Sequence, residues 1–219
     1  GGDFEFLEMP DEEAAARRIV ALCREELPRE GFNALEDVQV LSPMHRTPCG
    51  VDNLNRLLQA ALNPPAPEKA EFRNSTLTFR VGDKVMQTKN DYTKGVFNGD
   101  IGFIREVSAD GVKVRYSEEL TADYEPNELM MLTLAYAMSV HKSQGSEYPV
   151  IVLPLVAAHH IMLQRNLLYT AVTRAKKKVV LLGSKAAVFT AVSNDRTRRR
   201  YTLLAERLAG AGGESPLLA

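Results

Sequence analysis

Two short, uninterrupted apolar runs stand out in the second half of the chain, at residues 150–153 and 179–182. They consist of Val, Ile and Leu, and no polar residue alternates with them. Runs of this kind are typical of strands that are buried on both faces of a parallel sheet. Parallel strands need crossover connections, and a helix is predicted between the two runs, from about residue 165 to 175. A further helix is predicted from Ser184 to about Val192.

The first 62 residues repeat the order strand, helix, strand, helix. Residues 4–8 alternate as a half-buried strand does, and a helix is predicted from Pro10 until Pro28 ends it. Residues 38–41 form the next apolar run, and a helix is predicted over residues 51–62. This order predicts a parallel sheet with crossover helices, which is an α/β fold.

A segment of different texture interrupts the α/β pattern after the proline-rich residues 63–67. It contains short strand-like runs separated by Gly-Asp and Asp-Gly turn signals, at residues 76–80, 83–88, 101–107 and 112–116. This predicts a small all-β barrel over residues 71–128, inserted into a discontinuous α/β domain of residues 1–70 and 129–219. Residues 132–138 are predicted to be an apolar strand of the α/β domain, followed by a helix.

Charge is unevenly distributed, although the net charge is only −1. Residues 1–37 hold eleven acidic side chains against four arginines, whereas residues 165–200 hold ten Lys and Arg against one acid. The basic half is either a partner surface for a polyanion or a solvated face, and charge alone does not decide between them. For the arginine-rich residues 196–200, a solvated or partner-facing helix surface is the favoured interpretation.

The apolar runs are too short to span a bilayer, so no membrane association is expected. No secretory signal is found at the N-terminus, and the two cysteines, Cys23 and Cys49, are not in a CxxC arrangement. These features favour a reducing, cytoplasmic location. Because the sequence does not begin with Met, we expect it to be a fragment of a longer protein.

Several catalytic motifs are missing from the sequence. No GxxxxGK[ST] phosphate loop occurs and Gly-Lys pairs are absent, so the chain is not expected to build a phosphate loop by itself. No GxSxG, HExxH or clustered Cys/His set is present, and no metal site is predicted. The pair His159 and His160 is interpreted as a loop feature.

Three polar clusters adjoin the ends of predicted strands, at residues 42–47, 139–147 and 169–175. Open α/β folds place ligands at the edges of their sheets, so such clusters are candidates for a binding site. Each cluster taken alone is equally compatible with an ordinary polar loop.

Together, the clusters resemble the motifs of a known protein family. Residues 134–147 resemble motif V of superfamily 1 helicases, residues 168–175 their motif VI, and residues 40–46 their motif IV. The similarity is greatest to the RecD-type branch, whose second motor domain carries an inserted SH3-like barrel. Residues 81–87 and 96–102 resemble parts of that barrel.

The resemblance implies a RecA-like parallel sheet with helices on both faces, plus the inserted SH3-like barrel. It implies the second motor domain of an ATP-dependent DNA helicase that translocates 5′ to 3′. The expected partners are single-stranded DNA and the first RecA-like motor domain of the same protein, which would supply the phosphate loop and the ligands of Mg²⁺. Without that domain, this chain is expected to be inactive.

Residue roles follow from the resemblance. Arg174 matches the arginine finger, and Arg46 is implied as a second contact of the ATP γ-phosphate; a planar guanidinium that is always charged suits this task. The residues implied to line the nucleotide cleft are Gln144, Gly145 and Glu147, with Glu147 accepting hydrogen bonds from the ribose. For each arginine, an ordinary surface ion pair or solvated position is the alternative.

Contacts with DNA are implied for two parts of the chain. In motif V, the residues that match backbone contacts to single-stranded DNA are Ser139, His141 and Lys142. In the barrel, the turn residues that would contact DNA are Lys89, Asn90, Lys94 and Asn98. Tyr92 is a candidate for stacking on a base, whereas Phe97 is expected to pack in the core.

Two other functions agree with the same residues. The chain could be a non-catalytic DNA- or protein-binding adaptor derived from a helicase domain, although Arg174 and Glu147 would then have no purpose. It could also be half of a relaxase-helicase, which has similar motifs but different flanking domains.

Overall fold

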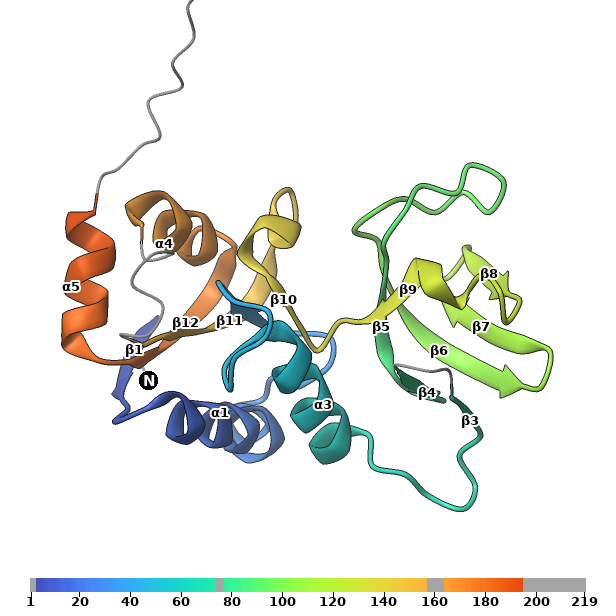
Figure 1. The fold of residues 1–219 in the computed structure, drawn as a ribbon, viewed down its shortest axis with the longest axis horizontal. Coiled ribbons are helices and arrows are strands. Elements are labelled where there is room, and N and C mark those ends of the chain that lie inside the picture. The colour runs from blue at the N-terminus through green and yellow to red at the C-terminus, as the bar shows by residue number, and fades with distance from the viewer. Residues whose placement is uncertain (1–2, 74–76, 157–163, 195–219) are drawn as a thin grey trace, which may run out of the picture.

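A parallel sheet of five strands forms the larger part of the molecule (Figure 1). The computed structural model describes residues 3–73, 77–156 and 164–194. In spatial order, the strands are β1 (Phe4–Glu8), β12 (Ala175–Gly183), β11 (Tyr148–Leu155), β2 (Val38–Ser42) and β10 (Ala137–Ser139). The predicted α/β fold with a parallel sheet is therefore confirmed.

Helices cover both faces of this sheet (Figure 1). They are α1 (Glu12–Ala21), α2 (Leu27–Arg29), α3 (Val51–Leu62), α4 (Arg165–Val172) and α5 (Lys185–Ser193). A π-helical turn, Leu22–Glu26, joins α1 to α2. The continuous helical run ends at Arg29, one residue beyond Pro28, close to where Pro28 was predicted to end it. None of the helices in the described ranges is long and apolar enough to cross a membrane.

Alternate residues of each central strand enter two different cores. In β11, Val150 and Val152 pack with Ile19 of α1 and Leu54 of α3. Ile151 and the residues that alternate with it pack on the opposite side, with α4 and α5. This arrangement explains why the strand is apolar at consecutive positions.

The inserted segment forms an antiparallel sheet. Its strands, in spatial order, are β8 (Thr121–Tyr124), β7 (Gly111–Arg115), β6 (Ile101–Ser108), β5 (Lys84–Gln87) and β9 (Leu132–Leu134). A two-stranded sheet of β3 (Glu71–Arg73) and β4 (Thr78–Arg80) precedes it. Strands β3 and β8 were not predicted. We refer to residues 71–134 as the β unit.

The apolar run at residues 132–138, predicted to be one strand, is divided between the two sheets. Residues 132–134 pair with β5 of the β unit, whereas residues 137–139 pair with β2 of the parallel sheet. Both halves are apolar because both enter a core, so composition does not show which sheet they join. The predicted following helix is one 3₁₀ turn, η3 (Val140–Ser143), and another 3₁₀ turn, η2 (Leu129–Met131), precedes β9.

Lys84 lies buried where the two sheets meet. Its ammonium donates a hydrogen bond of 3.3 Å to the Val38 carbonyl and lies 5.8 Å from the centre of the Tyr148 ring. Burial lowers the pKa of Lys84 to about 8. A buried ammonium with one carbonyl partner destabilises the folded state. At pH 7, Lys84 is still charged, so the folded state bears this cost.

We therefore expect Lys84→Met to raise the free energy of unfolding at pH 7 by up to about 3 kcal/mol. Between pH 8 and about 10.5, the unfolded chain holds the proton that the folded chain has released, so wild-type stability rises and the advantage of the variant shrinks. Chemical denaturation at pH 7 and pH 10 measures both values, with exposed Lys89→Met as the control. An equal advantage at the two pH values would contradict this expectation.

Candidate functional site

Residues 139–147 run from one edge of the parallel sheet to the other. They leave the C-terminal end of β10 and enter the N-terminal end of β11, and both strands run parallel to β2. The first part of the segment is therefore at the C-terminal edge of the sheet, and the last part is at the N-terminal edge. The two edges present different side chains.

At the C-terminal edge, the 3₁₀ turn η3 holds two basic side chains outward. The Ser139 hydroxyl accepts a hydrogen bond of 3.3 Å from the Lys142 N–H, which caps the turn. Val140 and Ser143 are buried, whereas His141 and Lys142 are exposed. Burial of one face of the turn thus fixes the direction in which the two candidate side chains, His141 and Lys142, project from the other face.

At the N-terminal edge, the chain turns sharply through Gly145. This residue has a φ of +87°, in the left-handed region that favours glycine. Gln144, Gly145 and Glu147 are all exposed here. The Glu147 carboxylate lies 3.1 Å from the Lys176 ammonium of the neighbouring strand β12.

Arg174 lies at the same edge, between α4 and β12. Its carbonyl accepts from the Tyr148 N–H at 2.8 Å, which fixes the backbone beside the start of β11. The guanidinium makes only long hydrogen bonds, of 3.5 Å to the Ser146 carbonyl and 3.4 Å to the Thr173 hydroxyl. Its Nε is buried without a partner, and no carboxylate pairs with Arg174 in the part of the chain that the structure describes. The guanidinium therefore retains N–H donors on its terminal nitrogens that no described residue occupies.

Arg46 lies at the opposite edge of the sheet from Arg174. It follows the C-terminal end of β2, and the loop stays at that edge through the hydrogen bond from the Val51 N–H to the Met44 carbonyl, 2.9 Å long. At Gly50, a Cβ would lie 2.3 Å from the His45 carbonyl oxygen, so this tight loop needs glycine. Arg46 is exposed and has no hydrogen bond or ion pair with any described residue. The structure thus places the two arginines at opposite edges of the sheet, and the predicted contact of Arg46 with the γ-phosphate stays a prediction.

The barrel candidates lie on the long connection between β5 and β6, residues 88–100, which we call the β5–β6 hairpin (Figure 1). Asn90 accepts a hydrogen bond of 2.9 Å from the Asn98 N–H, so it shapes the hairpin. Asn98 accepts a bond of 2.7 Å from the Lys142 ammonium and joins the hairpin to η3. Lys89 is exposed, but Lys94 is paired with Glu128 at 2.6 Å.

Two aromatic side chains project from this hairpin. Tyr92 is 78% exposed and Phe97 is 45% exposed, so the prediction that Phe97 packs in the core is wrong. Their ring centres are 5.8 Å apart in an edge-to-face arrangement. Other residues stabilise the hairpin. The Asp91 carboxylate accepts a hydrogen bond from the Lys94 N–H, and the Val96 side chain is buried.

The predictions did not include two features. Lys176 adds a second cation at the sheet edge where Arg174 lies, and it is paired with Glu147. This contact depends on the pairing of Tyr148 with Ala175 between two strands, which the sequence does not show. Asp83, interpreted only as a turn residue, is a buried acceptor between the sheets. Within the described ranges, no group of three or more His, Cys, Asp or Glu residues could hold a metal ion. His159, His160 and residues 196–200 lie outside the described residues.

Comparisons with known proteins identify both parts of the chain. Residues 54–122 match the SH3 domain of ATP-dependent RecD-like DNA helicases, and residues 134–182 match the UvrD-like helicase C-terminal domain. The chain is 38% identical over 199 residues to the ATP-dependent RecD2 DNA helicase of Deinococcus radiodurans, a match that covers 88% of the chain and 26% of that protein. It is 33% identical over 184 residues to the RecBCD enzyme subunit RecD of Mycolicibacterium smegmatis, covering 84% of the chain and 31% of the subunit. The chain thus spans between a quarter and a third of these relatives.

A solved structure shares the fold. The crystal structure of Pif1 helicase from Bacteroides, in complex with ADP-AlF3 and single-stranded DNA, superimposes with a TM-score of 0.53 at 19% identity. The match covers 94% of this chain and 55% of the Pif1 chain. At this identity, the similarity concerns the fold, and it includes the β unit as well as the parallel sheet.

Proposed function

The chain belongs to the RecD-type DNA helicases of superfamily 1 and carries their SH3 domain, and we propose that it is the second motor domain of an ATP-dependent DNA helicase. The observation that carries the proposal is Arg174, an arginine without a carboxylate partner in the described ranges, beside the turn at Gly145. The first RecA-like motor domain, with the phosphate loop, would belong to the same longer protein.

The N-terminal edge of the sheet is proposed to close over ATP. There, Arg174 would bind oxygens of the γ-phosphate, Gln144 and Gly145 would line the nucleotide, and Glu147 would accept hydrogen bonds from the ribose. Positive charge beside the γ-phosphate stabilises the transition state of phosphoryl transfer. The single carboxylate of this segment, Glu147, is paired with Lys176, so these residues do not suit Mg²⁺. We propose that the ligands of Mg²⁺ lie on the first motor domain.

The C-terminal edge is proposed to hold single-stranded DNA. Ser139, His141 and Lys142 would contact phosphates, which allows any base sequence to pass. Arg46 is exposed at the same edge, so we propose a DNA phosphate as a ligand for it, as an alternative to the predicted contact with the γ-phosphate. The hairpin residues Lys89, Asn90 and Asn98 would extend this surface.

Residues 139–147 would link the two sites, because they join the two edges of the sheet. Closing of the cleft on ATP would draw Arg174 toward the first motor domain, and hydrolysis would release it. Each cycle would shift the DNA-binding turn η3 along the strand. Translocation from 5′ to 3′ is proposed from the resemblance to the RecD-type branch.

ATP hydrolysis with and without single-stranded DNA tests this function. We expect no turnover from residues 1–219 alone, and DNA-stimulated turnover from a protein that adds the first motor domain. Absence of turnover in the longer protein would favour the adaptor function. Turnover by residues 1–219 alone would show that the chain itself contains a phosphate-binding loop.

A further inference from the structure

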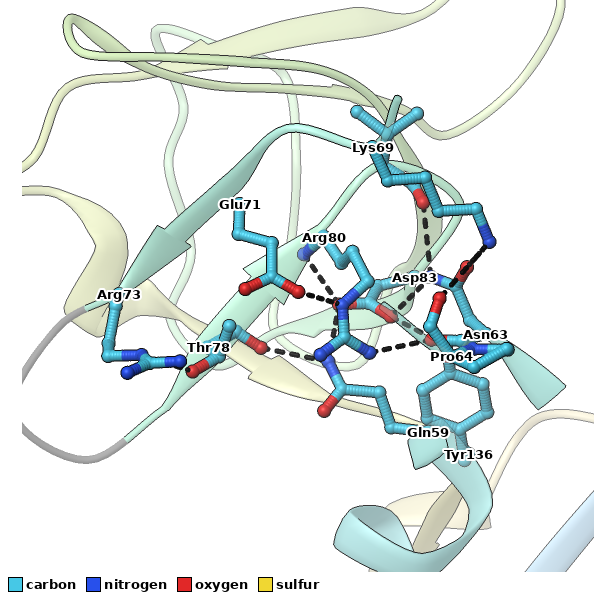
Figure 2. Close-up of polar contacts among 11 residues, drawn as sticks. Gln59, Asn63, Pro64, Lys69, Glu71, Arg73, Thr78, Arg80, Asp83 and Tyr136 are labelled. Carbon is cyan, nitrogen blue, oxygen red and sulfur yellow. Dashed lines mark hydrogen bonds and ion pairs between the residues drawn. The ribbon is translucent and has the colours of Figure 1, made fainter. Parts of the chain in front are cut away.

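The β unit and the parallel sheet are joined by two chain crossings that meet at one buried carboxylate. The first crossing leaves the end of α3, and the second is the short link of Ala135 and Tyr136 between β9 and β10. Asp83, just before β5, is fully buried between them. Figure 2 shows side chains from both crossings converging on it. No role of this residue follows from the ATP or DNA sites described above.

Four donors contact the Asp83 carboxylate. Gln59 and Asn63, at the end of α3, donate through their amide groups at 2.7 and 2.8 Å. The Tyr136 hydroxyl donates at 2.7 Å from the returning link. The Arg80 N–H, within the β unit, donates at 2.7 Å. The carboxylate thus ties three separate segments to one point.

The energetics favour a fixed arrangement. Burial raises the pKa of Asp83, and the hydrogen bonds oppose that rise by stabilising the charged form. A buried carboxylate that loses its donors costs several kcal/mol. Any rotation of the β unit that separated Asp83 from α3 or Tyr136 would incur this cost, so the cluster resists such a rotation.

Neighbouring contacts hold the donors in place. The Asn63 side-chain oxygen accepts from the Lys69 ammonium at 2.6 Å, which directs its NH₂ group toward Asp83 (Figure 2). Asn55 of α3 binds both backbone groups of Ala137, at 2.9 and 2.8 Å, as the chain enters β10. Because the Asn63 amide is already oriented, this donor cannot readily turn its oxygen atom toward a different side chain at position 83.

We propose that Asp83 is a positioning residue that makes the β unit move as one body with the second motor domain. The proposal rests on the proposed function. The β5–β6 hairpin would then follow η3 through each ATP cycle, since the Lys142 ammonium also reaches Asn98 at 2.7 Å. Taken alone, this exposed hydrogen bond is a weak tether, worth about 1 kcal/mol.

The expected consequence is specific to coupling. Arg174 lies beside β12, which β11 and β2 separate from β10, and among the described residues it shares no hydrogen bond or ion pair with the Asp83 cluster. We therefore expect that hydrolysis itself does not need the β unit in one orientation. Strand separation does, if the hairpin must advance together with η3. Loss of the cluster would lower the number of base pairs unwound per ATP and leave ATP turnover nearly intact.

The orientation is measured first, in residues 1–219. Dyes on cysteines introduced at exposed Arg17 of α1 and exposed Glu118 of the β unit report the distance between the two parts by single-molecule energy transfer. Cys23 and Cys49 are buried and will not take up dye. We expect one narrow distribution for the wild type and for the exposed control Asp123→Asn, and a broad or double distribution for Asp83→Asn. Tyr136→Phe, which removes one donor, should be intermediate. An unchanged distribution in Asp83→Asn would overturn the proposal.

The coupling is measured next, in a protein that includes the first motor domain, well below the unfolding temperature of each variant. We expect Asp83→Asn to keep DNA-stimulated ATP turnover within twofold and to lower base pairs unwound per ATP at least fivefold. An unchanged number of base pairs unwound per ATP, whether or not both rates fall, would overturn the proposal. If the wild type itself shows no DNA-stimulated turnover, the proposed function fails, while the distance measurement still decides whether Asp83 orients the β unit.

Discussion

Changing Arg174 to alanine should lower the DNA-stimulated rate of ATP hydrolysis by roughly 10³-fold or more, in a protein that joins this chain to the first motor domain. Among the described residues, the guanidinium makes two hydrogen bonds, both long, to Ser146 and Thr173, so we expect folding to depend little on it. Its removal should therefore act on the transition state, where charge on the γ-phosphate has to be stabilised. The effect should appear in kcat more than in KM.

The variant Arg174→Lys separates charge from geometry. Lysine keeps the positive charge but loses the planar fork that binds two phosphate oxygens at once, so we expect a partial loss. Lys177→Ala is the matched control, because Lys177 is an exposed cation close by on β12. Steady-state ATP hydrolysis and thermal unfolding of all three variants decide the matter. A rate for Arg174→Ala within twofold of the wild type would remove Arg174 from the ATP site.

The strands and helices that a local sequence pattern specifies were predictable. The apolar runs at residues 150–153 and 179–182 lie within β11 and β12, and the predicted helix at residues 51–62 coincides with α3. In each case a local pattern reflects burial on particular faces, and tertiary contacts do not change it. The identity of the inserted unit was predictable from motifs, which the match to the RecD-like SH3 domain confirms.

Properties that depend on distant segments were not predictable. Residues 132–134 and 137–139 have the same apolar character, yet they join different sheets. The Gly82-Asp83 pair resembles any turn, because its donors come from α3 and from Tyr136, far away in sequence. Arg46 and Arg174 both adjoin strand ends, but only the direction of each strand shows that they lie at opposite edges. Phe97 lies outside the core because Val96 fills the interior position beside it.

The exposed aromatic pair on the β5–β6 hairpin leads to the other large expected effect. Replacing both Tyr92 and Phe97 by alanine should weaken binding of single-stranded DNA by about 10- to 100-fold, since stacking contributes ~1–3 kcal/mol per base. Exposure of the two apolar rings to water is unfavourable, and 78% of Tyr92 and 45% of Phe97 are exposed. Their edge-to-face contact leaves ring faces free. A base stacked on either ring would bury that surface. The hairpin also lies beside the proposed phosphate contacts, through the bond between Lys142 and Asn98.

Salt dependence distinguishes stacking from charge. Stacking releases no counterions, so the double variant should keep the slope of log affinity against log salt, whereas Lys142→Ala should reduce that slope by about 0.7. Met130→Ala is the control for a general loss of apolar surface, because Met130 is 73% exposed but has no ring. Fluorescence anisotropy with labelled oligonucleotides at several salt concentrations measures all three variants in the protein that includes the first motor domain.

If Met130→Ala weakened binding as much as the double variant, or if the double variant changed the slope, the rings would not be stacking on bases. With the slope unchanged and Met130→Ala neutral, DNA would be held at its phosphates by η3 and at its bases by the hairpin. A strand gripped at both would then be advanced by the motor and the β unit together.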